Sequence, residues 1–325
     1  MMAFVRTVLG DIDRSNLGVT YAHEHLVIDG GRPVQLMPDF DLGDVDRMVV
    51  EVEEAASLGL RSVIDAMPCD AGRNAEKLAE ISRRTGVQIV APTGLHHERY
   101  YGPAHWSQRL TTAQLADLFV ADIVDGIDSY DYCGPVVHRT EHRAGVIKIA
   151  GSDGGPSARD RSIFEAAAEA HRRTGAPILT HCEAGTGALE QVRLLADLGV
   201  ALEHVALSHV DKVVDRGYHR ELLASGACAE YDGSFRWGDE PNGTVQLIAW
   251  MTEDGFDHRI VLGMDAARQG YYHAYGGQPG LVWLLGEFRA LLEQAGIGGD
   301  VRDRMFVGNP ARVFAFVETE GVVAR

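Results

Sequence analysis

The chain has 325 residues, of which 46% are hydrophobic and 24% are charged, and its formal net charge is −17. These proportions are ordinary for a folded globular protein and argue against an intrinsically disordered chain. An acidic surface of this kind repels nucleic acid and anionic lipid, so we expect neither as a partner.

Short apolar runs alternate with longer amphipathic segments along almost the whole chain. The predicted strands cover residues 19–26, 61–66, 87–93, 144–149, 176–181, 204–209, 227–231 and 259–265. The predicted helices cover residues 44–58, 74–85, 112–125, 159–174, 189–198, 212–224, 244–254 and 281–294. Eight strand–helix units without an intervening linker predict an α/β fold: a single (β/α)8 TIM barrel in which residues 1–325 form one domain.

The cysteines and the N-terminus bear on the compartment. The four cysteines, Cys69, Cys133, Cys182 and Cys228, show no C-x-x-C spacing, which is typical of reduced thiols rather than a disulfide framework. The first residues carry no apolar run of signal-peptide length, and no stretch approaches the roughly 20 apolar residues of a membrane span. We therefore expect a cytoplasmic protein that does not engage a membrane.

Ligand-type side chains lie at the ends of the predicted strands, which is where active sites of this fold are built. These residues are His23 and His25 on the first strand, Lys148 on the fourth, His181 on the fifth, His209 on the sixth and Asp265 on the eighth. Residues i and i+2 of a strand face the same side, so both imidazoles of the first strand can face the barrel interior. Each residue alone has a structural explanation, but the whole set predicts a metal centre.

Lys148 is the least expected member of this set, because a lysine inside an apolar strand is costly unless it is neutralised. Desolvation lowers its pKa, and the neutral amine can add CO2 to become a carbamate, which is an anionic oxygen ligand. We therefore predict that carboxylated Lys148 bridges two divalent ions. The other predicted ligands are His23, His25 and Asp265 for one ion, and His181 and His209 for the second.

Imidazole and carboxylate ligands suit Zn2+, with Mn2+ or Co2+ as alternatives. Two ions that share a hydroxide lower its pKa and polarise the carbonyl or phosphoryl group that it attacks. Asp265 is then the predicted catalytic residue, which takes the proton of the attacking water and delivers it to the leaving group. Glu24, between the two histidines, is expected to point away from the metals, and Cys69 and Cys182 are expected to be buried apolar side chains. The loop histidines His96, His97, His105 and His273 are not predicted as ligands.

Seven segments surround these residues in chain order: GVTYAHEHL, SVIDAMPCDAGRN, AGVIKIAGSDGG, PILTHCEAG, ALSHVDK, VLGMDAARQGYY and VGNPARVFAF. In their order, spacing and flanking residues they resemble the phosphotriesterase-like family of the amidohydrolase superfamily. The resemblance implies a distorted TIM barrel with a binuclear site, and all six ligand positions are filled here. Relatives of this kind are usually dimers, so the resemblance also implies a homodimer.

Two loops are similar to the branch of that family that opens phosphorylated sugar lactones. They are DAARQGYYHAYGG, from Asp265, and GLHHERYYGPAHW, after the third predicted strand. In that branch an arginine and a tyrosine hold the phosphate of the substrate, and they map onto Arg268 and Tyr271. A guanidinium fork and a phenol suit a terminal phosphate.

The same branch supplies a lysine after its seventh strand, where this chain reads DGSFRWGDEPN. Trp237 takes that position, and the neighbouring Arg236 is a candidate substitute for the lysine. Tyr100 and Tyr101 are further candidates to line the pocket and bind a small-molecule substrate.

These features favour hydrolysis of a sugar-acid lactone, with or without a phosphate, through attack of the metal-bridged hydroxide on the carbonyl. The scaffold also hosts organophosphate-triester, acyl-homoserine-lactone and small N-acyl amide hydrolases, so the fold does not settle the substrate. Triesters and acyl-homoserine lactones favour an apolar pocket, whereas these loops are rich in Arg, Asp and Tyr. A non-catalytic binding protein on a degenerate barrel is a further alternative, although the complete ligand set argues against it.

Overall fold

Parallel strands form the centre of the computed structural model, which describes residues 3–238 and 241–317. One sheet contains β3 (Thr20–Glu24), β4 (Ser62–Asp65) and β5 (Gln88–Val90). The other contains β6 (Pro92–Gly94), β7 (Val146–Gly151), β8 (Ile178–Cys182), β9 (Val205–Ser208), β10 (Cys228–Tyr231) and β11 (Ile260–Leu262). All of these strands pair in parallel, in chain order.

Two connections join these sheets. Only Ala91 separates β5 from β6, and its carbonyl accepts a hydrogen bond from Gly145 N at 2.8 Å, so the third predicted strand is present in two halves. On the other side, Asp265 N, just after β11, donates to the carbonyl of His23 in β3 at 2.9 Å. The strands therefore follow one another around a ring, and the fold is the predicted (β/α)8 barrel.

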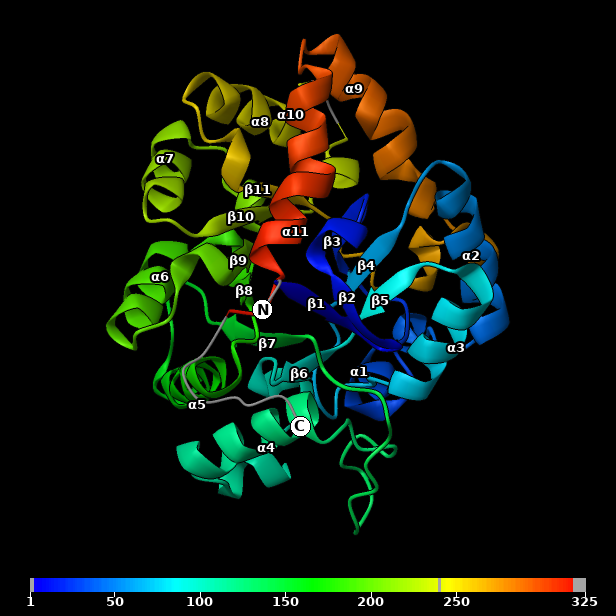
Figure 1. Cartoon of the computed structure of the whole chain (residues 1–325), viewed down its shortest axis with the longest axis vertical. Helices are drawn as coiled ribbons and strands as arrows, with labels where there is room; N and C mark the ends of the chain where they lie inside the picture. The colour runs from blue at the N-terminus through cyan, green and yellow to red at the C-terminus, as the bar shows by residue number, and fades with distance from the viewer. Residues whose placement is uncertain (1–2, 239–240, 318–325) are drawn as a thin grey trace.

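Helices surround the strands on the outside (Figure 1). They include α2 (Val45–Ser57), α3 (Ala75–Thr85), α4 (Thr112–Val124), α5 (Ala158–Thr174), α6 (Ala188–Asp197), α7 (Arg216–Ala224) and α8 (Gly243–Glu253), with the shorter α1 (Gly31–Leu36) and α9 (Arg289–Gln294). Thr111 and Ser157 begin α4 and α5 with capping boxes, in which side chain and backbone bond reciprocally. Gly86 and Gly175 end α3 and α5 in the left-handed conformation expected of a C-terminal glycine.

Two predicted helices differ from those observed. The segment 281–294 is helical throughout, but it changes from a 3-10 turn (Leu281–Trp283) through a π-turn (Leu284–Phe288) to α9. The segment 212–224 becomes helical only at Arg216, because Asp215 caps α7 by accepting from Tyr218 N and a separate 3-10 turn occupies Val210–Lys212. No helix within residues 3–238 and 241–317 has the length and apolar character that a membrane crossing requires.

The floor of the barrel is sealed by elements that the sequence did not predict. β1 (Phe4–Thr7) and β2 (Gly10–Asp13) form an antiparallel hairpin, and α10 (Gly299–Asp303) and α11 (Asn309–Val313) follow α9. A buried apolar cluster joins Val5, Leu17 and Phe314 from these terminal segments to strand residues such as Val90, Val146, Leu179 and Val261. The N-terminal end of the barrel is thereby closed with apolar side chains, and the polar residues gather at the opposite end.

Candidate metal centre

The six predicted ligands meet at the C-terminal end of the strands. His23, Lys148 and His181 lie within β3, β7 and β8, whereas His25, His209 and Asp265 follow β3, β9 and β11. Nζ of Lys148 lies 3.4 Å from Nε2 of His23, and Oδ1 of Asp265 lies 3.2 Å from Nε2 of His25. The ring of His209 lies 4.4 Å from that of His181 and 5.0 Å from that of His23, centroid to centroid.

Two of these residues adopt a backbone conformation that residues other than glycine rarely adopt. His209 has a φ of 67° and Asp265 a φ of 49°, both in the left-handed region. Such conformations persist only where the surrounding structure holds them, and they are frequent at active sites. For Asp265 the restraint is visible. Its own N–H donates to the carbonyl of His23, and the carboxylate of Glu24 accepts from Met264 N at 2.8 Å and from Ala266 N at 3.5 Å, so the segment is held on both sides. Glu24 thus points away from the ligand cluster, as predicted.

Neighbouring side chains engage one ring nitrogen of three of the histidines. Nδ1 of His23 lies 3.0 Å from Oγ of Ser208 and 3.1 Å from Oε2 of Glu230. Nε2 of His181 donates to Glu183 at 2.9 Å, and Nδ1 of His209 lies 2.7 Å from Oδ2 of Asp232. The other nitrogen of each ring is left for a ligand, which is the usual arrangement around metal-binding histidines.

The sequence did not predict the carboxylates that contact these histidines. Glu230 and Asp232 are buried at the end of β10, and both approach His23. Burial, followed by the adjacent Asp232 carboxylate, raises the pKa of Glu230 well above its usual range. Burial also acts to raise the pKa of Asp232, but His209 outweighs it and the pKa is lowered. The available signal was two acidic residues, i and i+2, at the end of an apolar strand.

The protonation states suit a divalent cation. Burial lowers the pKa of Lys148 to about 8 and the pKa values of His23 and His181 well below the usual range, which favours neutral nitrogen donors. Oδ1 of Asp232 and Nδ1 of His25 are buried without a hydrogen-bond partner among the described residues. Buried polar atoms without partners are costly, so this donor set fits a bound metal better than a purely structural network.

A cavity of about 270 Å³ opens directly over the ligand cluster. Apolar side chains of Ile28, Phe40 and Met67 form part of its wall. Four cations, Arg99, Lys212, Arg236 and Arg268, also line it, against two carboxylates, Glu183 and Asp265. Tyr100 and Tyr271 line it as well. The local excess of positive charge is notable in a chain with a net charge of −17, because it favours an anionic group on whatever the cavity binds.

Tyr101 does not line the cavity, which corrects its prediction as a substrate-binding residue. Its side chain is buried, its hydroxyl donates to the carbonyl of Cys69 at 3.0 Å, and it accepts from His96 N at 2.8 Å. The phenol of Tyr101 therefore supports the loop after β6 from the side away from the cavity, whereas Tyr100 lines the cavity. Cys69 and Cys182 are both buried, as predicted.

Three of the four cations differ in how far they are engaged by other side chains and by the backbone. Arg236 bonds the carbonyls of Asp232, Met264 and Asp265, so it holds the loop that carries Asp265. Arg268 pairs with Asp39 at 2.5 Å. Lys212, which the sequence did not single out, makes no side-chain hydrogen bond or ion pair with the part of the chain that the structure describes.

Trp237, beside Arg236, bonds Thr244 Oγ1 at 3.0 Å and is not part of the cavity wall.

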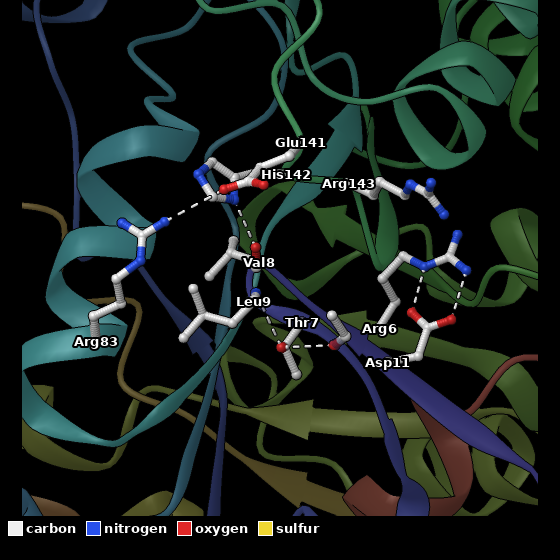
Figure 2. A pocket seen from close by; sticks show the side chains of 10 residues that line it. Arg6, Thr7, Val8, Leu9, Asp11, Arg83, Glu141, His142 and Arg143 are labelled. Carbon is white, nitrogen blue, oxygen red and sulfur yellow. Dashed lines mark hydrogen bonds and ion pairs between the residues drawn. The ribbon is translucent and has the colours of Figure 1, made fainter.

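A larger hollow of about 470 Å³ lies at the opposite end of the barrel, beside the β1–β2 hairpin (Figure 2). Its charged groups largely neutralise one another: Arg6 pairs with Asp11 at 2.7 Å and Arg83 with Glu141 at 3.7 Å. His142 donates to the carbonyl of Val8 at 2.7 Å. None of the predicted site residues lies there, so the smaller cavity over the ligand cluster is the candidate functional site.

Comparisons with known proteins agree with this geometry. The model of the phosphotriesterase family matches residues 3–314. The "Phospho-furanose lactonase" of Mycoplasmopsis synoviae is 32% identical over 97% of this chain and 92% of that protein, and the protein of the same description from Mycoplasmopsis agalactiae is 34% identical with the same coverage. The crystal structure of an amidohydrolase from Mycoplasma synoviae superposes with a TM-score of 0.93, at 31% identity over 98% of this chain and 94% of that one. The chain therefore belongs to the phosphotriesterase family and is a metal-dependent hydrolase that acts on ester bonds.

Proposed function

We propose that the protein opens the lactone ring of a sugar acid, and that phosphorylated furanose lactones are its preferred substrates. The observation that carries this proposal is the cationic lining of the small cavity over the ligand cluster. A phosphorylated sugar lactone presents an ester carbonyl for hydrolysis and a dianionic group for such a lining. The two Mycoplasmopsis relatives described as phospho-furanose lactonases support the same substrate class.

His23, His25 and Asp265 would hold one divalent ion, His181 and His209 a second, and carboxylated Lys148 would link the two. Zn2+ is the leading candidate, because imidazole and carboxylate are its preferred ligands. Bound metal of this kind polarises a carbonyl and lowers the pKa of water. The lowered pKa of Lys148 supports the carbamate, because only the neutral amine can react with CO2.

Asp265 would move the proton. Burial acts to raise the pKa of this carboxyl, but His209 and His25 lower it well below the usual range, so the group is ionised, which is the form that can take up a proton. In the reaction the water oxygen bonds to the lactone carbonyl carbon and gives its proton to Asp265. The bond between that carbon and the ring oxygen then breaks, and Asp265 returns the proton to the departing alkoxide.

Lys212, Arg268 and Tyr271 would bind the phosphate. Lys212 is free of any described partner, whereas Arg268 would exchange the partly exposed Asp39 for the substrate. Arg236 serves a different role from the phosphate-binding lysine of similar proteins, because its guanidinium bonds the backbone around Asp265. Tyr100 would contact the sugar from the opposite lip.

Steady-state assays of the zinc-reconstituted protein against matched furanose lactones, with and without a terminal phosphate, test this proposal. We expect kcat/KM to be at least about 100-fold higher for the phosphorylated substrate, since two charge-assisted contacts are gained. Turnover no faster than with free zinc ion would contradict lactone hydrolysis. Phosphotriesters, acyl-homoserine lactones and N-acyl amino acids form the comparison panel, and a higher kcat/KM for any of them would replace the proposed substrate.

A further inference from the structure

Glu183 lies within 3.3 Å of three side chains at the edge of the metal centre, two of which donate hydrogen bonds to it. It begins the 3-10 turn Glu183–Gly185, which directly follows β8 and its histidine ligand. Oε2 of Glu183 accepts from Nε2 of His181 at 2.9 Å and lies 3.0 Å from Nε2 of His97. Arg99 donates to both oxygens, at 3.3 Å to Oε1 and 3.0 Å to Oε2.

These three residues come from one loop and one strand. His97 and Arg99 belong to the loop after β6, in which the 3-10 turn Glu98–Tyr100 carries a cavity-lining tyrosine. His181 belongs to β8 and to the ligand cluster. A single carboxylate thus joins a candidate metal ligand to the lip of the substrate cavity, and it forms part of the cavity wall itself.

The backbone of the turn that follows Glu183 is tightly constrained. Ala184 has a φ of 53°, in the left-handed region that residues with a side chain seldom adopt. A Cβ on Gly185 would lie 2.7 Å from the carbonyl oxygen of His209, so only glycine allows the turn to approach so closely. The chain therefore turns sharply directly after Glu183 and packs against the segment of His209.

We propose that Glu183 is a positioning residue that fixes the tautomer and ring orientation of His181 and couples them to the Glu98–Tyr100 turn. The hydrogen bond keeps the proton on Nε2, so that Nδ1 retains the lone pair that a metal would take. The inference rests on the proposed function in one respect, because it assumes that His181 is a metal ligand. Unlike Glu230 and Asp232, which are fully buried, Glu183 has 30% of its side chain exposed, on the substrate side of the centre.

The test compares metal retention in the zinc-loaded protein, Glu183→Gln and Glu98→Gln during titration with a chelator. We expect Glu183→Gln to lose one ion at a roughly 10–100-fold lower chelator concentration, with the second ion held as in the unmodified protein. Glu98 is an exposed acid on the same lip without contact to the ligands, so Glu98→Gln removes an equal charge and is expected to leave retention unchanged. Arg99→Met removes the guanidinium contact to Glu183 together with one charge of the cavity wall, so it should raise KM at least threefold while retaining both ions.

The tautomer supplies a readout that needs no metal. Nitrogen-15 NMR of the metal-free protein should find His181 protonated at Nε2, and should find a mixture of tautomers in Glu183→Gln. Equal retention in Glu183→Gln and the unmodified protein, or an already mixed tautomer in the unmodified protein, overturns the inference. Glu183→Gln could fail to fold. In that case the inference is overturned if Arg99→Met has the same KM and the same metal retention as the unmodified protein. An unmodified protein that binds no metal, yet has the Nε2 tautomer, refutes the proposed function and leaves the Glu183 contact standing.

Discussion

The carboxylate of Glu24 accepts a hydrogen bond from the backbone N–H of Met264 at 2.8 Å, and so joins the first strand of the barrel to the segment after the last. Its second oxygen lies 3.5 Å from Ala266 N. Asp265 lies between these two donors, with its carboxylate 3.2 Å from Nε2 of His25. The residue that separates two candidate ligands in the sequence therefore holds a third in place.

Replacing Glu24 by alanine should destabilise the protein and disturb the position of Asp265. Two buried N–H groups lose their acceptor, which costs about 2–4 kcal/mol in the free energy of unfolding. Glu24→Gln keeps one carbonyl acceptor and the shape of the side chain, so its effect should be less than half as large. Urea unfolding of both variants measures this difference, and an alanine variant as stable as the unmodified protein would refute the role.

Lys148→Ala should abolish both metal retention and hydrolysis. Burial lowers the pKa of Lys148 to about 8, and the carbamate that its amine would form cannot be replaced by a methyl group. Added formate or acetate should restore part of the activity by filling the vacated space with a carboxylate. The measurement is hydrolysis at increasing carboxylate concentration, and a variant that is fully active without any addition would exclude the bridge.

Lys212→Met and Arg268→Met should each raise KM for a phosphorylated lactone by roughly 10–100-fold, since each removes a charge-assisted contact of about 1.5–3 kcal/mol. Hydrolysis of the same lactone without phosphate should change less than twofold. Arg109→Met, at an exposed arginine outside the cavity wall, is the matched control. Equal effects on both substrates would show that these residues support the fold rather than the phosphate.

Stability should fall on acidification through His219. This buried histidine bonds the carbonyl of Val213 and the hydroxyl of Tyr231, both at 2.8 Å, and burial lowers its pKa to about 4. As the pH falls, the unfolded chain takes up the proton of His219 before the folded chain does. The contribution of this histidine to the free energy of unfolding is therefore complete above pH 6.5, and up to about 3 kcal/mol of it is lost as the pH falls toward 4.

In His219→Gln this part of the pH dependence should disappear, as measured by the free energy of unfolding in urea between pH 4 and 7. His258→Gln, at an exposed histidine, is the control and should retain it. A pH profile unchanged by His219→Gln would contradict the assignment.

Much of the candidate site could be predicted from the sequence because a barrel brings its strand ends together. Once eight strands are recognised, His23, His181 and Asp265 must converge, although they are far apart in the chain. The carboxylates that contact the histidine ligands could not be found in this way. Glu183 is one of many acidic residues near strand ends, and the sequence does not show that its carboxylate approaches His181, only two residues away.

Neighbouring residues of the same type were equally hard to distinguish. Tyr100 and Tyr101 are adjacent and chemically identical, and a single step along the 3-10 turn decides which one faces the cavity. The β1–β2 hairpin escaped prediction because its strands have only four residues each, too few for a clear alternation of apolar and polar side chains.

The most direct test of a metal-dependent hydrolase built on these strand ends is elemental analysis of the purified protein, read together with its lactone hydrolysis. The account predicts about two divalent ions per chain, and loss of hydrolysis when a chelator removes them. Fewer than about one ion per chain, with hydrolysis unaffected by the chelator, would contradict it.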